Sequence, residues 1–168
     1  MAITKLVADS ITSGAIANTP AFSVYPSAAT SLSDVTNTKI AFNTEILDTD
    51  SAFNTSTNRF TVPSGKGGYY QINLKAVFEE LGGEFSQVVL MIYKNGSNIS
   101  EDNIYSGNLG AGFATTERWS RSISKIVYLN DGDYVEGFGY INETSGNAGE
   151  VSATQFLTTF DGYRLIGV

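Results

Sequence analysis

The chain has 168 residues, a formal net charge of −7, and neither cysteine nor histidine. Without cysteine it has no disulfides or thiolate metal sites, and without histidine it lacks the commonest general base and transition-metal ligand. The acidic balance, with no run of basic residues, disfavours contact with nucleic-acid phosphates, so we expect no nucleic-acid partner.

The first segment, residues 1–19, is predicted to be an extended arm. Its apolar spacing is interrupted by Ser10, Thr12, Ser13 and Gly14, which argues against an amphipathic helix. The segment lacks the pattern of a secretory signal, and no run of about 20 apolar residues predicts membrane insertion. The arm is expected to anchor the protein through its apolar residues, which are Ile3, Leu6, Val7, Ile11 and Ile16.

From Pro20 onward the pattern indicates short strands. Residues 21–25, 39–42 and 59–62 are short apolar or aromatic runs. Residues 69–78 alternate between apolar and polar side chains, as in a strand with one buried side. Residues 87–93 are apolar throughout, which is typical of a strand covered on both faces. The Asn95-Gly96 pair that follows is a strong hairpin signal.

The second half of the chain continues in the same way. Residues 103–117 are predicted to be a loop, residues 119–129 a strand, and residues 130–133 a tight turn. A further turn is expected at residues 145–147, and the last strand over residues 155–168. Eight to ten short strands joined by turns predict an all-β sandwich or jelly roll, so we divide the chain into the arm, 1–19, and one domain, 20–168.

Several spacings carry a family resemblance. Phe42, Asp48, Phe53 and Phe60 are followed by Gly68, Tyr70, Ile72 and Leu74. This order resembles the signature of the globular-head family of complement component 1q, within the tumour necrosis factor-like jelly rolls. The gap between Phe60 and Gly68 is two residues longer than the family pattern, and Ile72 and Leu74 replace aromatics. Residues 20–23, 90–96, 129–135 and 160–165 resemble further family motifs in the same order.

The resemblance implies a ten-stranded jelly-roll sandwich that assembles as a homotrimer and has no conserved active site. Family members bind proteins, glycans or other surfaces through loops and outer faces. The aromatic residues expected to fill the core or the trimer seam are Phe22, Phe42, Phe53, Phe60, Tyr70, Phe78, Phe138, Tyr140, Phe160 and Tyr163. For Tyr134, Phe138 and Tyr140 a carbohydrate-stacking face is an open alternative.

Acidic residues give the remaining candidates. Some members of the family bind calcium, and Asp131 and Asp133 are the weak candidates for calcium ligands here; the competing interpretation is that they stabilise a turn. A second pair, Asp48 and Asp50, has the same two interpretations. The carboxylates of Glu79, Glu80 and Glu84 could serve glycoside hydrolysis, but a solvated loop is the preferred interpretation. We therefore expect no enzyme, no catalytic residue and no cofactor other than calcium.

The start of the chain, residues 1–16, is similar to the starts of small structural proteins of tailed bacteriophages. This resemblance implies a virion protein made in the host cytoplasm, with the arm bound to a capsid or tail protein. The exposed domain would act in capsid decoration or as a head fibre, or contact a host-surface glycan or protein in host attachment. The alternatives are a tail-fibre tip, that is, a receptor-binding knob, and an extracellular adhesion module of a cell that binds glycans or proteins.

Overall fold

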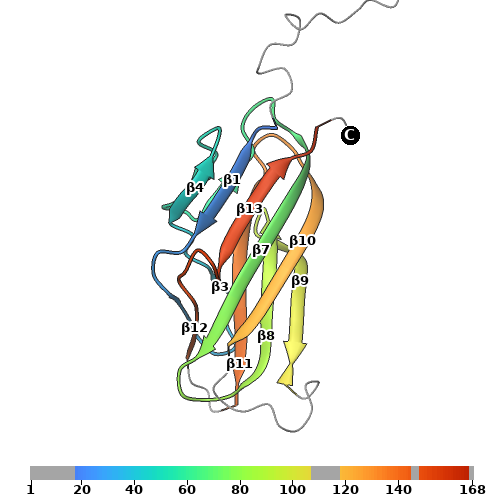
Figure 1. The fold of residues 1–168 in the computed structure, drawn as a ribbon. Helices are drawn as coiled ribbons and strands as arrows, with labels where there is room; N and C mark the ends of the chain where they lie inside the picture. Colours follow the sequence, from blue (N-terminus) through green and yellow to red (C-terminus); the bar gives the residue numbers. More distant parts are fainter. Residues whose placement is uncertain (1–17, 107–117, 145–147, 167–168) are drawn as a thin grey trace, which may run out of the picture.

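The computed structural model describes residues 18–106, 118–144 and 148–166, which form thirteen strands. The strands make two antiparallel sheets that pack face to face, and the described residues contain no α-helix (Figure 1). Accordingly, no helix in this part of the chain is long and apolar enough to cross a membrane. The all-β prediction is confirmed.

The first sheet, called sheet A, has seven strands in the order β2-β12-β7-β13-β1-β4, with β10 on the other side of β7. Its long central strand β7 pairs with β10 from Gly68 to Phe78, and with β13 and then β12 along its opposite edge. The strands are β1 (Ala21–Tyr25), β2 (Thr30–Leu32), β4 (Thr44–Asp48), β7 (Gly68–Glu80), β10 (Trp119–Leu129), β12 (Gly149–Val151) and β13 (Thr159–Arg164).

The second sheet, called sheet B, has six strands in the order β5-β6-β11-β8-β9, with β3 also paired to β11. The hairpin between β8 and β9 turns at Asn95 and Gly96, which both have the positive φ predicted from their sequence, 50° and 80°. The strands are β3 (Thr38–Lys39), β5 (Phe53–Asn54), β6 (Arg59–Thr61), β8 (Phe85–Lys94), β9 (Ser97–Tyr105) and β11 (Tyr134–Glu143).

The observed strands differ from the predicted ones in number and in position. Five of the thirteen are only two or three residues long, too short for alternation to be visible in a sequence. Strand β4 lies in a segment without a predicted strand because none of its residues is buried, so it has no apolar face to detect. Strand β9 extends to Tyr105 where a loop was predicted from residue 103, and β13 covers only Thr159–Arg164 of the predicted 155–168.

The core lies between the two sheets and is rich in phenylalanine. Phe22 stacks on Phe60 with ring centroids 4.5 Å apart and meets Phe160 edge-on at 5.1 Å. Burial raises the pKa of the Tyr70 hydroxyl to about 12, and this hydroxyl donates a hydrogen bond to the Lys66 carbonyl at 2.7 Å. Seven of the ten candidate aromatics lie in this core: Phe22, Phe42, Phe53, Phe60, Tyr70, Phe78 and Phe160.

The other three candidates, Phe138, Tyr140 and Tyr163, are not core residues but lie on the outer faces of the sheets. In β11 the inward positions belong instead to small or aliphatic residues, including Gly137 and Gly139. A Cβ at Gly137 would approach Phe42 to 2.9 Å, and one at Gly139 would approach Phe78 to 3.0 Å. Rings from sheet A and the adjoining loop therefore fill the space opposite these glycines, and the aromatics of β11 face outward.

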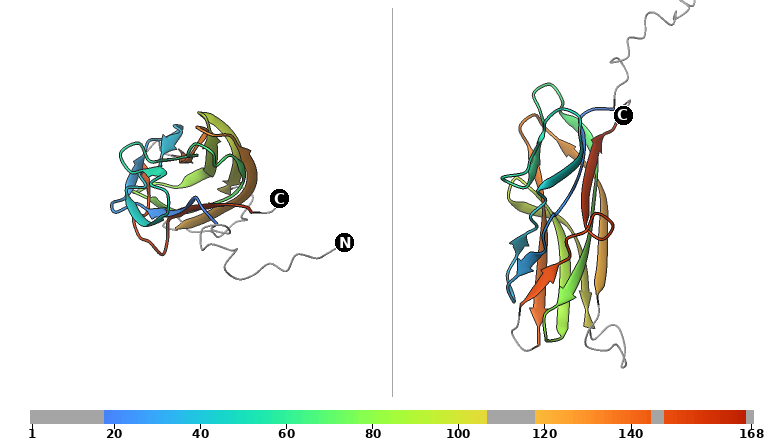
Figure 2. Two further views of the ribbon diagram at one scale, coloured as in Figure 1. Left: turned by 90° about the horizontal axis from the view of Figure 1, so that it is seen from above. Right: turned by 60° about the vertical axis from the view of Figure 1, so that its left-hand side comes forward.

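The sandwich is elongated, and the two ends of the described chain lie together at one end of it (Figures 1 and 2). We call this end, where the described chain begins and ends, the near end. Residues 81–84 and the described residues that flank 107–117 and 145–147 lie at the opposite end, the distal end. The predicted arm apolar residues, Ile3 to Ile16, and the predicted turn at 145–147 fall outside the described residues.

Candidate binding surfaces

The two carboxylates proposed for calcium are held by turn contacts at the near end. Asp131 accepts hydrogen bonds from the backbone N–H groups of Gly65 and Gly67 at 2.6 and 2.7 Å. Asp133 pairs with Lys94 at 2.8 Å and accepts a hydrogen bond from Asn95 at 2.7 Å. Calcium prefers oxygen ligands, but both carboxylates here are surrounded by N–H donors.

The calcium interpretation therefore does not fit these residues. Asp48 also accepts two backbone N–H bonds, from Ala52 and Phe53 at 3.0 and 2.9 Å, while Asp50 lies 3.5 Å from Lys66. Across the described ranges, no group of three or more acidic side chains is placed to hold a metal ion. The contacts favour turn stabilisation by these aspartates.

The turn carboxylates predict how stability depends on pH. Backbone N–H donors, from Gly65 and Gly67 first, lower the pKa of Asp131, and the hydrogen bond from Lys94 lowers that of Asp133. Near pH 4 the unfolded chain, with aspartate pKa values of about 3.9, binds more protons than the folded one. The stabilisation is therefore complete above pH 4 and is lost as the pH falls through the folded values.

We expect Asp133→Asn to be less stable than the unchanged protein at pH 7 and to lose less additional stability on going to pH 3. Urea unfolding at both pH values measures this. An equally steep loss in both proteins would contradict the assignment of acid sensitivity to Asp133.

Glu79 and Glu80, predicted to lie in a solvated loop, instead end strand β7 at the distal end, and their carboxylates make structural contacts. Glu79 pairs with Arg118 at 3.2 Å, and Glu80 accepts a hydrogen bond from the Phe85 N–H at 3.0 Å, which closes the turn between β7 and β8. Trp119 meets Phe85 edge-on at 6.1 Å and packs partly against the core.

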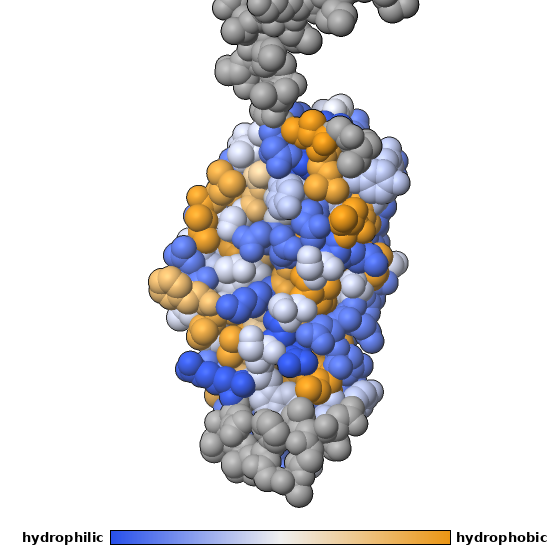
Figure 3. Space-filling model, turned by 45° about the vertical axis from the view of Figure 1, so that its right-hand side comes forward, coloured by the Kyte–Doolittle hydropathy of each residue, from blue (hydrophilic) through white to orange (hydrophobic). Residues whose placement is uncertain are grey.

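The outer face of sheet A carries exposed apolar and aromatic side chains toward the near end. Tyr69 and Tyr128 meet edge-on at 5.2 Å, and Ile126 and Tyr163 flank Gln71 on the two neighbouring strands. Figure 3 shows hydrophobic groups on this side of the molecule, several of them toward the near end. The exposed fractions are 57% for Ile126, 50% for Tyr128, 46% for Tyr69 and 38% for Tyr163. We call these four residues the sheet A patch.

The outer face of sheet B has an aromatic surface of its own. Val89 and Met91 point outward from β8, yet they are only 5% and 4% exposed. Tyr140 and Phe138 are their cross-strand neighbours on β11. Phe138 also lies against Tyr93, with ring centroids 4.2 Å apart. The half-buried rings of Tyr93, Phe138 and Tyr140 therefore lie on the same outer face of this sheet.

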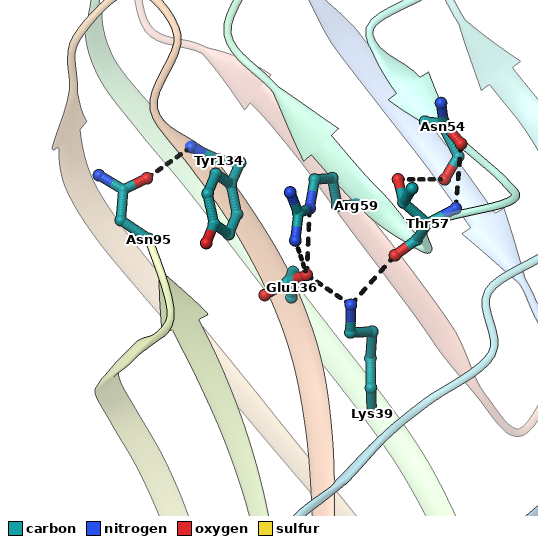
Figure 4. A network of polar contacts seen from close by, with 7 residues as sticks. All are labelled: Lys39, Asn54, Thr57, Arg59, Asn95, Tyr134 and Glu136. Carbon is teal, nitrogen blue, oxygen red and sulfur yellow. Dashed lines mark hydrogen bonds and ion pairs between the residues drawn. The ribbon is translucent and has the colours of Figure 1, made fainter.

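Next to these rings lies an ion-pair network centred on Glu136 (Figure 4). The Glu136 Oε1 atom accepts from Lys39 Nζ at 2.7 Å and from Arg59 Nη2 and Nε at 2.8 and 3.1 Å. The Arg59 guanidinium lies over the Tyr134 ring, 3.8 Å from its centroid. Lys39 also donates to the Thr57 carbonyl at 3.2 Å. The network spans the break along β11 where its neighbour changes from β6 to β3.

Neither Lys39 nor Arg59 stands out in the sequence as a functional residue. Each lies in a short strand, and they are separated from Glu136 by 97 and 77 residues. The available signal was Glu136 itself, which shares one face of β11 with aromatic residues. A charged side chain among aromatic residues is expected to be paired, because glutamate is almost never fully buried without a partner.

Comparison with known proteins identifies the fold. No protein-family model matches the chain, and no curated protein matches it. Solved structures do: murine APRIL at pH 5.0 has a TM-score of 0.61 and 12% identity, covering 86% of this chain and 98% of that one. The globular domain of zebrafish complement 1qA has a TM-score of 0.60 and 16% identity, covering 88% and 98%. Eiger TNF from S. frugiperda has a TM-score of 0.62 and 10% identity, covering 88% and 93%.

The chain therefore has the jelly-roll fold of the tumour necrosis factor-like and complement 1q globular-head domains, as the sequence resemblance implied. At these identities the likeness defines the fold. What the chain binds has to be argued from its own surfaces.

Proposed function

We propose that the chain is a non-enzymatic, homotrimeric structural and binding protein of a bacteriophage virion. Residues 1–19 attach it to a capsid or tail protein, and the domain of residues 20–168 is exposed as capsid decoration or as a head fibre. In this role the protein is made in the host cytoplasm, and its exposed surfaces contact a host-surface glycan or protein.

The observation that carries this proposal is the position of the chain ends. The described chain begins and ends at the near end, and the turn at residues 81–84 lies at the distal end (Figure 1). An attachment through the preceding residues therefore leaves the distal end directed away from it. The similarity of residues 1–16 to the starts of phage structural proteins supplies the virion context.

The sheet A patch supports self-association. Its four side chains come from three neighbouring strands, β7, β10 and β13, so they form one surface and are not isolated exposed residues. Exposed apolar groups gathered on one face are typical of an interaction site. Most oligomers of soluble proteins are homo-oligomers, so a second copy of the same chain is the usual partner for such a surface. Three copies would also multiply weak contacts with a host surface through avidity.

Two measurements test the proposal. Sedimentation equilibrium of the full chain at micromolar concentration should give three times the mass of 18.0 kDa. A chain lacking residues 1–19 should keep this trimeric mass but fail to bind phage particles that lack the protein. A monomeric full chain would contradict the trimer, and particle binding by the truncated chain would contradict anchoring by the arm.

A further inference from the structure

We propose that the outer face of sheet B binds an acidic glycan, a polysaccharide that contains uronic acids. Lys39 and Arg59 bind the sugar carboxylate, and the rings of Tyr93 and Phe138 support the sugar ring. This inference names the ligand class of the binding role proposed above and rests on that role.

The cluster of Lys39, Arg59 and Glu136 carries a surplus of positive charge. Two cations, Lys39 and Arg59, share one oxygen of a single carboxylate, that of Glu136. The cluster therefore has a net charge of +1 on a chain whose net charge is −7. The Glu136 side chain is only 4% exposed, whereas those of Lys39 and Arg59 are each 32% exposed. The surplus positive charge is therefore open to solvent and complementary to an anion.

Lys39 and Arg59 also have hydrogen-bond donors that their contacts within the chain do not use. An arginine has five N–H donors and a lysine has three. Among the described residues, Arg59 uses two donors on Glu136, and Lys39 uses one on Glu136 and one on Thr57. Three donors of Arg59 and one of Lys39 are left for a ligand. Charge-assisted hydrogen bonds from such groups to a carboxylate are about twice as strong as neutral ones.

Aromatic side chains adjoin the cationic cluster. Lys39 is the cross-strand neighbour of Phe138, and Glu136 is that of Tyr93, so the cationic cluster and the ring pair touch along β11. A pyranose ring has an apolar face of C–H groups, which suits contact with an aromatic ring, and a carboxylate at its edge. Met91, the cross-strand neighbour of Phe138, is buried beside it on the same face of the sheet.

These features favour a sugar acid over an acidic peptide because the anion site adjoins aromatic rings, which can contact the C–H groups of a sugar. The site also lies on the opposite sheet from the sheet A patch. It therefore stays accessible when the chain self-associates through that patch, and three copies would bind a repeating polymer at several points.

The test uses the full chain and three probes of equal length. An oligogalacturonate of about six sugars carries one carboxylate per ring, its methyl ester has the same rings without charge, and a polyglutamate has the charge without rings. Calorimetry should show binding of the oligogalacturonate at physiological salt and of neither other probe.

Lys39→Gln should weaken oligogalacturonate binding about tenfold, since it removes one charge-assisted bond and cancels the surplus charge. Lys75→Gln, which removes the same charge from the outer face of sheet A, is the matched control and should bind as the unchanged chain does. Phe138→Leu keeps an apolar cover over Met91 but removes the ring, and should weaken binding while leaving the fold intact. If Lys39→Gln does not fold, binding of the oligogalacturonate by Phe138→Leu still tests the inference.

Equal binding by the Lys39 and Lys75 variants, binding of polyglutamate as tight as that of the uronate, or no uronate binding would each overturn the inference. Sedimentation of the same samples separates this failure from that of the proposed function. A trimer that decorates particles but ignores uronates refutes only the glycan assignment, whereas a monomer refutes the proposed assembly.

Discussion

Replacing Phe160 with alanine is expected to lower the free energy of unfolding by about 3–5 kcal/mol, the usual cost of removing a buried phenylalanine. The Phe160 ring is fully buried and contacts three others: Phe22 at 5.1 Å, Phe42 at 5.4 Å and Phe53 at 6.3 Å between centroids. These partners come from β1, from β5 and from the segment before β4. The cavity would therefore loosen several elements at once, and urea unfolding at fixed protein concentration measures the loss.

The chain offers a matched control for this substitution. Phe156 lies in the segment between β12 and β13 and is 83% exposed. Phe156→Ala removes the same atoms from a site without burial, so it should change stability by no more than about 0.5 kcal/mol. If Phe160→Ala and Phe156→Ala lowered the free energy of unfolding by similar amounts, the packing of Phe160 against its three neighbouring rings would not stabilise the fold as proposed.

Replacing Ile126 with aspartate is expected to prevent the proposed trimer from forming and leave the chain monomeric. Ile126 is the most exposed residue of the sheet A patch, and its neighbours on that face include Gln71 and Tyr128. A carboxylate there would lose its water on association without gaining a partner, and this costs several kcal/mol per copy. Sedimentation equilibrium should show the mass falling threefold.

Leu81→Asp is the control for this experiment. Leu81 is 53% exposed in the turn between β7 and β8 at the distal end, and the substitution adds the same charge as that at Ile126. It should leave the proposed trimer intact. If Leu81→Asp dissociates the protein and Ile126→Asp does not, the self-association surface has been placed at the wrong end of the sandwich.

The sequence was most informative where a strand has two different faces or a turn needs special backbone angles. The alternation of residues 69–78 and the Asn95-Gly96 turn both predicted what the structure contains. The phenylalanine spacing from Phe42 to Phe60 anticipated the core because these rings fill one space between the sheets.

The sequence was least informative where a contact joins distant segments. In β11 two alternating sets of residues were visible, but the outward orientation of the aromatic set depends on rings from Phe42 and Phe78 filling the space opposite the glycines. The Glu136 network was invisible for the same reason, since Lys39 and Arg59 meet it only after β3 and β6 pair with β11.

The position of the chain ends has a mechanical consequence. If the arm is fixed to a particle and the distal end is pulled by a host surface, the force enters at β1 and runs along the length of the strands. Strand β1 is paired antiparallel to both β13 and β4, so its hydrogen bonds would be loaded in parallel rather than opened one after another. A sandwich loaded in this direction resists rupture far better than one peeled from an edge, and is suited to bearing tension.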